Sequence, residues 1–399
     1  MKYDFDTAAD RRNVGAYKWE NIFASMGPGS EDVIPLFVAD MDFSIMPEIS
    51  EAICALAKKG VYGYTVPTER YYGAVKKWML TRHRWEIRKE WISLSPGVVP
   101  GICSAINAFT DPGDKIIIQQ PVYYPFMNAI LSNGRRISNN ELVYEEGRYT
   151  MDFSDLEERA KDPRAKAFLL CSPHNPVGRV WTKEELKQAA EICLRNDVLI
   201  FSDEIHFDLI FPPHNHHVMA TLSREIQNKS IIFTAPSKTF NLAGLQCSNI
   251  VIANPELKKI YDRGAGATGF FALNSFAYES CITAYEKGGR WHEELLDYLA
   301  GNIRYIKTFL ETHLPMIRAV ETQGTYLVWL DCRSLGLESV ELQRFMRERA
   351  RIFPSEGRVF GSAGEGFERI NVACPRHFLE AAMENLKSAI MEGKEAQNG

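Results

Sequence analysis

The chain has 399 residues, of which 45% are hydrophobic and 24% are charged, and its formal net charge at pH 7 is −5. These values are typical of a globular protein of two or three domains. The negative charge argues against a nucleic-acid partner bound through a basic surface, and no apolar run approaches the roughly 20 residues of a membrane-spanning helix. We therefore expect neither a nucleic acid nor a membrane as a partner.

Cysteine and histidine usage indicates the compartment and argues against a bound metal. The eight cysteines are scattered and none belongs to a C-x-x-C motif, which gives no support to a zinc site or a disulfide framework. The run PPHNHH at residues 212–217 lacks the spacing of a metal site and is better explained as a polar loop. Since the polar N-terminus is no signal peptide, we expect a reducing, cytoplasmic location.

Apolar and amphipathic runs alternate between about residues 93 and 253. A helix is expected over residues 182–197, where Thr182 and Glu185 have the spacing of a capping box. Strands are expected in DKIIIQQP (114–121), AKAFLLCSP (165–173), VLIFSDEIHFDLIF (198–211), SIIFTAP (230–236) and NIVIAN (249–254). This alternation, with strands rich in Ile, Val, Leu and Phe, predicts an α/β fold with a mostly parallel sheet and helices on both of its faces.

The pattern changes near residue 290. Long amphipathic runs at 291–314, 339–350 and 376–393 predict helices, and GTYLVWLDC (324–332) and FERINVAC (367–374) predict strands. We expect a large domain over residues 46–289 and a smaller α+β domain over residues 290–399. The weakly periodic residues 1–45 are expected to pack against the smaller domain or across a subunit boundary.

Two polar features stand where strands give way to loops. In LSPGVVPG (94–101), Gly97, Val98 and Val99 open a helix, and free N–H groups at a helix start can hold an anion, although most such turns are only structural. Asn175 lies just before a proline after the strand at 165–173, and it offers an amide donor or simply forms a turn. Neither feature identifies a ligand alone.

Two charged residues stand at strand ends as well. Asp203 ends the run VLIFSD, and a carboxylate there is costly to bury unless it caps a helix or meets a cation. Lys238 follows SIIFTAPS and could be a solvated charge, a phosphate ligand or a covalent anchor. A desolvated lysine becomes a nucleophile, as the formation of a Schiff base requires.

Taken together, these features suit pyridoxal phosphate (PLP). This cofactor has a phosphate, a phenolic oxygen, a ring nitrogen and an aldehyde, for which the helix start, Asn175, Asp203 and Lys238 offer partners. A carboxylate at the ring nitrogen makes the ring an electron sink. Tyr123, in PVYYPF, is an aromatic side chain able to stack on the ring. We therefore expect PLP as the cofactor.

The order N-P-x-G, D-E and S-K-T-F resembles fold-type I PLP enzymes of the aminotransferase class I/II superfamily, in spacing as well as sequence. The resemblance implies an aspartate-aminotransferase-like fold with a seven-stranded sheet. It implies that Lys238 binds the aldehyde, that Asp203 faces the ring nitrogen and that Asn175 faces the phenolic oxygen. Ser237 and the amides of Gly97–Val99 would hold the phosphate. Arg369 would bind the substrate α-carboxylate, unless it is a surface ion pair.

Two departures point to one branch of this superfamily. Gln246 stands where many members have an arginine that pairs with the phosphate, and His206 stands where many have a tyrosine. These residues resemble the MalY/PatB-type C–S lyases, the cystathionine β-lyase-like branch. So do IPLFVADMDF (34–43), GVYGYT (60–65) and FGSAGEGFERIN (360–371).

The branch also implies roles for two residues outside the four motifs. Tyr64 would reach the phosphate of the other subunit and serve catalysis there, which implies a homodimer with shared active sites; otherwise it is a packing residue. Ala39, within VADMDF, would line the pocket mouth and contact substrate, unless this run is only a structural loop. His206 would stand near the phenolic oxygen.

The resemblance implies β-elimination of cystathionine or related cysteine S-conjugates to a thiol, pyruvate and ammonia. Lys238 would remove the Cα proton of the substrate. An aminotransferase remains the alternative enzyme, because the two reactions diverge only after that step. A PLP-binding regulator acting through protein contact is a third reading, which the presence of a substrate arginine disfavours.

Overall fold

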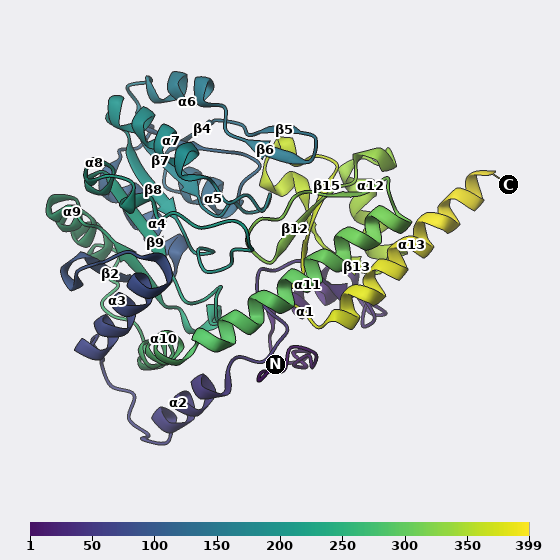
Figure 1. Cartoon of the computed structure of the whole chain (residues 1–399), viewed down its shortest axis with the longest axis horizontal. Coiled ribbons are helices and arrows are strands. Elements are labelled where there is room, and N and C mark those ends of the chain that lie inside the picture. Colours follow the sequence, from purple (N-terminus) through teal and green to yellow (C-terminus); the bar gives the residue numbers. More distant parts are fainter. Residues whose placement is uncertain (399) are drawn as a thin grey trace.

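The structure is a computed structural model that describes the backbone of residues 1–398 and the side chains of residues 1–393. A seven-stranded sheet lies at the centre of its larger part (Figure 1). In spatial order its strands are β2 (Ile92–Ser95), β10 (Ser248–Val251), β9 (Ser230–Thr234), β8 (Leu199–Asp203), β7 (Ala165–Cys171), β3 (Lys115–Ile118) and β4 (Arg136–Asn139). Only β10 runs antiparallel to the other six strands. The predicted, mostly parallel sheet is confirmed.

The strands are apolar on both faces because helices cover both. Ile116 and Phe233 belong to one hydrophobic cluster, whereas the adjacent Ile117 and Ile232 belong to another on the opposite face. The first face packs against α4 (Val98–Phe109), α5 (Pro125–Ser132) and α9 (Pro255–Gly266). The second packs against α3 (Glu69–His83), α6 (Phe153–Ala160), α7 (Lys183–Arg195) and α10 (Ser275–Lys287), and α2 (Pro47–Ala57) packs on α10. Alternate residues of each strand thus enter two cores.

The helix expected over residues 182–197 forms as α7, with the predicted capping box. The Thr182 hydroxyl accepts a hydrogen bond from the Glu185 N–H at 3.1 Å, and the Glu185 carboxylate accepts one from the Thr182 N–H at 2.8 Å. Two donors at the helix start are therefore satisfied reciprocally.

A second, antiparallel sheet forms the core of the C-terminal part. Its order is β11 (Arg318–Ala319), β12 (Leu327–Asp331), β15 (Phe367–Asn371) and β14 (Ser355–Glu356). Two long helices, α11 (Gly289–His313) and α13 (Arg376–Asn398), pack together beside it (Figure 1). The helix expected over 339–350 is α-helical only in α12 (Ser339–Arg344), because Phe345–Arg349 form a π-helical turn.

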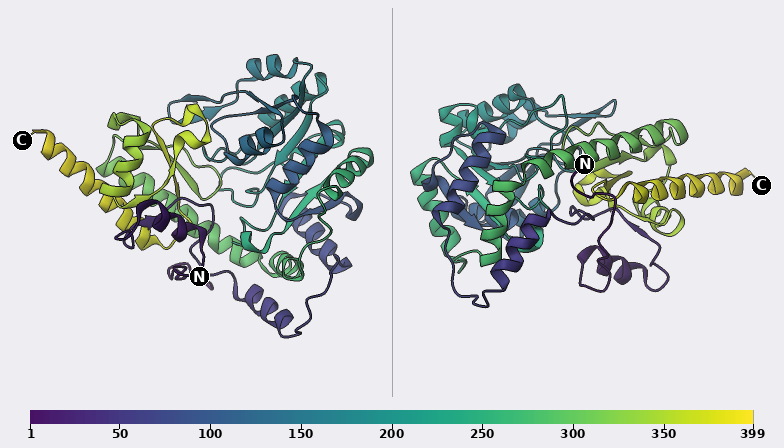
Figure 2. Two further views of the ribbon diagram at one scale, coloured as in Figure 1. Left: turned by 180° about the vertical axis from the view of Figure 1, so that it is seen from behind. Right: turned by 60° about the horizontal axis from the view of Figure 1, so that its bottom comes forward.

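The N-terminal residues lie against this second part. α1 (Tyr17–Met26) precedes β1 (Ile34–Pro35), which pairs in parallel with β13 (Ile352–Phe353). Both views in Figure 2 place this segment beside the C-terminal elements. The remaining elements are the β5 (Val143–Glu145) and β6 (Arg148–Thr150) hairpin and α8 (Arg224–Asn228). The domain boundaries at residues 45 and 289 stay predictions, and α11 begins at Gly289.

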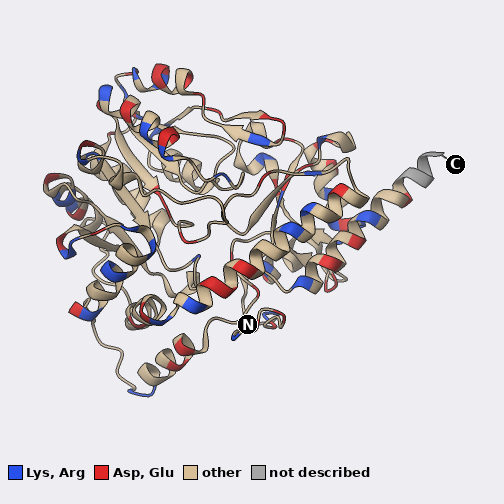
Figure 3. Cartoon of the chain, in the orientation of Figure 1, with Lys and Arg blue, Asp and Glu red and all other residues tan. Residues whose placement is uncertain are grey.

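Acidic and basic residues are interspersed along α11 and α13, as the colouring of Figure 3 shows. Among the described residues, no helix is both long and apolar enough to cross a membrane.

Candidate active site

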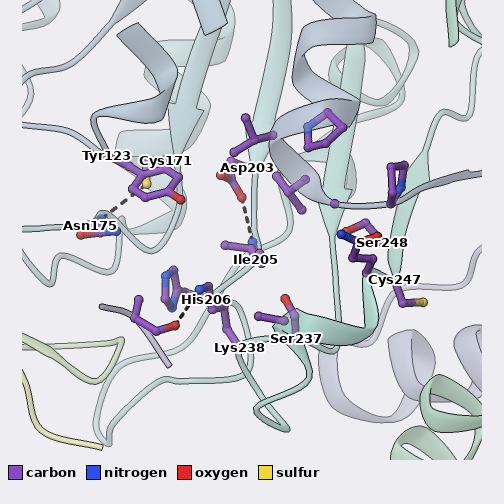
Figure 4. Close-up of a pocket in the computed structure, with 18 residues that line it drawn as sticks. Tyr123, Cys171, Asn175, Asp203, Ile205, His206, Ser237, Lys238, Cys247 and Ser248 are labelled. Atoms are coloured by element: carbon purple, nitrogen blue, oxygen red, sulfur yellow. Dashed lines mark hydrogen bonds between the residues drawn. The ribbon is translucent and has the colours of Figure 1, made fainter. Parts of the chain in front are cut away.

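The parallel strands bring distant polar residues to one edge of the large sheet. Asp203 is the last residue of β8, Asn175 follows β7, and Lys238 follows β9. Tyr123 follows β3, and Gly97 lies between β2 and α4. Because the carboxyl ends of parallel strands meet at one edge, these residues surround a pocket of about 230 Å³ (Figure 4).

One wall of this pocket is the start of α4. Gly97 is its N-cap residue and provides no side-chain cap, and the first turn carries no acidic residue. Val98 and Val99 line the pocket, and their backbone N–H groups, which belong to the first turn of the helix, have no side-chain cap. Ser237 and Gln246 also line the pocket. This wall suits an anion, although Gln246 supplies no positive charge.

Lys238 lies in the pocket with its amine fixed by the backbone. Its Nζ donates a hydrogen bond to the Ala39 carbonyl at 2.7 Å (Figure 4), and the Tyr326 hydroxyl donates to the same oxygen at 2.8 Å. Burial lowers the pKa of Lys238 to about 8, with Asp40 and Asp203 opposing this shift and Arg369 adding to it. About a tenth of the amine is thus unprotonated at pH 7, far more than for an ordinary lysine, and this form can act as a nucleophile or base.

Asp203 is a buried carboxylate whose oxygen accepts a hydrogen bond from the Ile205 N–H at 3.0 Å. Burial raises the pKa of Asp203 to about 7, while the Ile205 N–H and Lys238 act in the opposite direction. A cationic ligand group beside this carboxylate would stabilise its charged form.

His206 lies beside Lys238 (Figure 4). Burial, and then the charges of Lys238 and Arg369, hold the pKa of His206 well below its ordinary value, so the imidazole is neutral. Its Nδ1 has no hydrogen-bond partner among the described residues. A residue that lines the pocket therefore has a buried polar atom without a partner.

Arg369 reaches the site from β15 of the second sheet. Its Nη1 donates to Asn175 Oδ1 at 2.9 Å, and its Nη2 donates to the Ser355 hydroxyl at 2.9 Å and the Phe37 carbonyl at 3.3 Å. The side chain is buried, and burial lowers the pKa of Arg369 to about 10. Within the described part of the chain it pairs with no carboxylate, and its Nε has no partner. A buried guanidinium in this state favours an anionic ligand.

The amide of Asn175 is oriented by this arginine. Because Asn175 Oδ1 accepts from Arg369, the Nδ2 group remains as a donor for a ligand. Asn175 therefore links the substrate-arginine candidate to the pocket.

The loop after β9 that carries Lys238 (the lysine loop) and the loop after β8 that begins behind Asp203 (the Asp203 loop) are joined behind the pocket. Thr239, next to Lys238, donates its hydroxyl hydrogen bond to Asp208 at 2.7 Å. Asp208 also accepts from Trp78 Nε1 at 3.1 Å and lies 2.7 Å from His83 Nε2. Burial opposes ionisation of Asp208, but His83, His292 and the Thr239 hydroxyl hold its pKa below the ordinary value. The buried carboxylate thus fixes both loops to α3.

Most of the residues predicted from the sequence do line the pocket. They are Ala39, Gly97, Val98, Val99, Tyr123, Asn175, Asp203, His206, Ser237 and Lys238. Arg369 does not line it directly but contacts Asn175. Tyr64 is not brought to this pocket in the single chain: it is 99% exposed, and its ring lies 6.3 Å from that of Phe271.

The sequence interpretation missed several lining residues. Cys171, Ile205, Cys247 and Ser248 line the same pocket. Ser248 pairs with Ser95 across an antiparallel contact, so the start of β10 lies at the edge where β2 ends. The antiparallel direction of β10 would have revealed Cys247 and Ser248, but a short apolar run does not show its direction. Among the described residues, no group of three or more His, Cys, Asp or Glu side chains could hold a metal ion.

Known proteins share this architecture over the full chain. Cystathionine beta-lyase PatB from Bacillus subtilis (strain 168) is 39% identical over 387 residues, covering 97% of this chain and 100% of PatB. Cystalysin from Treponema denticola, a structure that contains pyridoxal 5'-phosphate, matches with a TM-score of 0.96 and 43% identity, over 98% of this chain and 100% of that one. The PLP-bound C-S lyase from Staphylococcus hominis matches with a TM-score of 0.90 and 31% identity, over 98% of both chains.

The family described as aminotransferase class I and II matches residues 31–386. This range contains the pocket residues, from Ala39 to Ser248, as well as Arg369. The chain therefore belongs to the aminotransferase class I and II family.

Proposed function

We propose that this protein is a PLP-dependent carbon–sulfur lyase that converts cystathionine or related cysteine S-conjugates to a thiol, pyruvate and ammonia. Its likeness to PatB, cystalysin and the staphylococcal C-S lyase supports this activity. The observation that carries the proposal is the meeting of Lys238, Asp203 and Asn175 in one pocket beside the buried Arg369.

The pocket residues fit each polar group of PLP. The N–H groups of Val98 and Val99 and the Ser237 hydroxyl suit the phosphate, and Tyr123 offers a ring surface. The unpartnered Nδ1 of His206 and the free Nδ2 of Asn175 suit the phenolic oxygen. The buried Asp203 carboxylate suits a protonated ring nitrogen. When bound, PLP supplies an electron-withdrawing ring that takes up the charge left on the substrate Cα after proton removal.

The chain's own residues bind the amino acid and move its proton. Arg369 binds the α-carboxylate of the substrate through its guanidinium, and Asn175 holds that guanidinium in place. The amine of Lys238 removes the proton from Cα, because its lowered pKa leaves it able to accept one near neutral pH. Loss of the thiolate from the β-carbon then follows if that carbon carries sulfur.

Tyr64 enters this proposal through a second copy of the chain. It is exposed together with Val61, Tyr62, Val66 and Phe271, so the segment presents an apolar surface that a partner subunit would cover. We propose a homodimer in which Tyr64 of the partner subunit reaches the phosphate wall. Its hydroxyl would add a donor where Gln246 leaves no fixed positive charge.

An aminotransferase remains the alternative reaction, since the family includes that activity in its description. A regulator that binds PLP and acts only by protein contact would have no need of a buried, carboxylate-free Arg369. If partner binding by a Lys238→Ala protein persisted in full, a regulatory role separate from catalysis would be supported.

The deciding experiment supplies L-cystathionine to the purified, PLP-loaded protein without any keto acid. A lyase releases pyruvate and free thiol in equal amounts, and a Lys238→Ala protein at matched cofactor content releases neither. Product formation that requires an added keto acid would instead identify an aminotransferase. Failure of the protein to bind PLP at all would overturn the assignment of the pocket.

We place the protein in the cytoplasm. All eight cysteines carry free thiols, and six of them are buried, which suits a reducing compartment. Fractionation of cells that express the chain at its natural level would test this location.

A further inference from the structure

The segment Phe37–Phe43 is held along its whole length although it belongs to no helix or long strand. Each of its seven backbone carbonyls accepts a hydrogen bond from outside the segment. The donors, in chain order, are Arg369 Nη2 to Phe37, Asn371 Nδ2 to Val38, Lys238 Nζ and Tyr326 OH to Ala39, Asn371 Nδ2 to Asp40, Asn241 Nδ2 to Met41, the Ala9 N–H to Asp42 and Asn241 Nδ2 to Phe43. The segment therefore joins β15 to the lysine loop.

Two side chains of this segment anchor it to the N-terminal residues. Lys18 of α1 is fully buried, and its Nζ lies 3.1 Å from Asp40 Oδ1 and 2.8 Å from Asp42 Oδ2. Arg11 lies 2.8 Å from Asp40 Oδ2. A buried lysine is costly unless it is paired, so these carboxylates fix the segment against α1.

Asp40 is thus the residue directly after the carbonyl that binds Lys238 and one of the two residues that bind Lys18. We propose that Asp40 is a positioning residue for Lys238: held by Lys18 and Arg11, it fixes the Ala39 carbonyl as the acceptor of the lysine amine and keeps a negative charge one residue from that carbonyl. This inference rests on the proposed function, in which Lys238 holds and releases a proton.

The charges around Lys238 show why Asp40 matters to it. Burial lowers the pKa of Lys238, and the opposing effect of Asp40 is larger than that of Asp203. Arg369 lowers the pKa further. The other polar groups nearby are neutral, because burial holds the pKa of His206 well below and that of Tyr326 well above their ordinary values. Asp42 binds the same Lys18 but lies three residues from the carbonyl that accepts the hydrogen bond of Lys238.

Asp42 therefore provides a matched control for Asp40. The test compares Asp40→Asn, Asp42→Asn and Asp40→Glu in the full chain. The apparent pKa of Lys238 is measured without cofactor by competitive acetylation across pH, with the Lys238 peptide quantified by mass spectrometry. In the PLP-loaded protein, a pH titration of the cofactor absorbance gives a second value, and thermal unfolding reports the structural cost of each change.

We expect Asp40→Asn to lower the apparent pKa of Lys238 by about one unit, since a negative charge near the amine is lost. Acetylation of Lys238 at neutral pH should rise accordingly. Asp42→Asn should lower the thermal midpoint without changing the pKa of Lys238. Asp40→Glu, which keeps the negative charge, should leave that pKa close to the wild-type value. Equal shifts in Asp40→Asn and Asp42→Asn, or none in either, would overturn the inference in favour of a purely structural cluster.

A variant at the edge of the cluster covers the case in which Asp40→Asn does not fold. Arg11 is partly exposed and its charge offsets that of Asp40, which Lys18 continues to hold when Arg11 is changed, so Arg11→Gln should raise the apparent pKa of Lys238. An unchanged or lowered value would count against the inference. These readouts are independent of turnover: a missing shift with pyruvate release intact rejects only the role of Asp40. The predicted shift without pyruvate release rejects only the lyase.

Discussion

Arg369 combines burial with an incomplete set of partners. Its donors reach an amide oxygen, a hydroxyl and a backbone carbonyl, and all three of these acceptors are uncharged. Burial of a guanidinium among neutral partners costs free energy, and an ion pair with a bound carboxylate would offset this cost. This set of neutral partners favours the binding of an anionic ligand.

We predict that Arg369→Lys weakens substrate binding, because a lysine amine cannot reproduce the planar, two-point contact with a carboxylate. The loss of one charge-assisted hydrogen bond corresponds to a KM increase of about 10- to 100-fold. Steady-state kinetics with L-cystathionine would measure it. Arg333→Lys is the control, because Arg333 pairs with Asp331 on an exposed surface. An unchanged KM in the Arg369 variant would show that another residue binds the carboxylate.

Strand β15 places charged side chains in different surroundings on its two faces. Arg369 faces the site, whereas Glu368 lies on the other face, directly opposite Glu356 of β14. Both carboxyl oxygens of Glu368 lack hydrogen-bond partners among the described residues. Burial, and then the charge of Glu356, raise the pKa of Glu368 well above its ordinary value.

This raised pKa predicts a pH-dependent stability. In the unfolded chain Glu368 ionises near its ordinary pKa, so it takes up a proton on folding at intermediate pH. The free-energy cost of burying Glu368 is absent at pH values below its pKa in the unfolded chain. This cost grows as the pH rises towards its pKa in the folded chain. Glu368→Gln should therefore increase the free energy of unfolding at pH 8, by roughly 1 kcal/mol, with a smaller gain at pH 5.

Urea unfolding at both pH values would measure this change. Glu341→Gln, which alters an exposed carboxylate of α12, should leave the free energy of unfolding unchanged at each pH. A loss of stability at pH 8 in the Glu368 variant would mean that the ionised carboxylate has a stabilising partner.

The elements of the large sheet were accessible from sequence because their signals are local. Apolar runs such as those of β7 and β9, and the capping box of α7, depend on neighbouring residues alone. Once the strands are taken as parallel, their ends must meet, so Asn175, Asp203 and Lys238 follow from the fold.

The remainder of the site depends on contacts between residues far apart in the chain. The Ala39 carbonyl meets Lys238 across 199 positions, and Thr239 reaches Asp208 behind the pocket. Backbone acceptors leave no mark in a sequence, so these contacts were not predicted. Arg369 was assigned only through the family resemblance, since nothing in its own run separates a substrate ligand from a surface ion pair.

For the whole molecule, the proposed dimer makes a sharp prediction about shared sites. Tyr64 and Lys238 lie in one chain, but only Lys238 lines the pocket of that chain. If Tyr64 of the partner subunit completes each site, Lys238→Ala and Tyr64→Ala proteins should each have little activity alone. A mixed dimer would then contain one intact site and one doubly altered site.

Co-expression of the two variants with different tags tests this arrangement. Since half of the dimers formed at random are mixed, the pool should regain about a quarter of the wild-type activity. Mixing the two purified variants without subunit exchange is the control and should give no gain. No recovery in isolated mixed dimers would mean that Tyr64 acts within its own chain.

The central claim is that Lys238 is the residue to which the cofactor is bonded. Borohydride reduction of the PLP-loaded protein fixes the cofactor on the lysine that holds it, and peptide mass spectrometry then identifies that residue. We predict a single modified peptide, with the added mass on Lys238 of the stretch TAPSKTFNLAGLQ. Modification of a different lysine, with Lys238 unmodified, would contradict the assignment of the pocket and of the chemistry built on it.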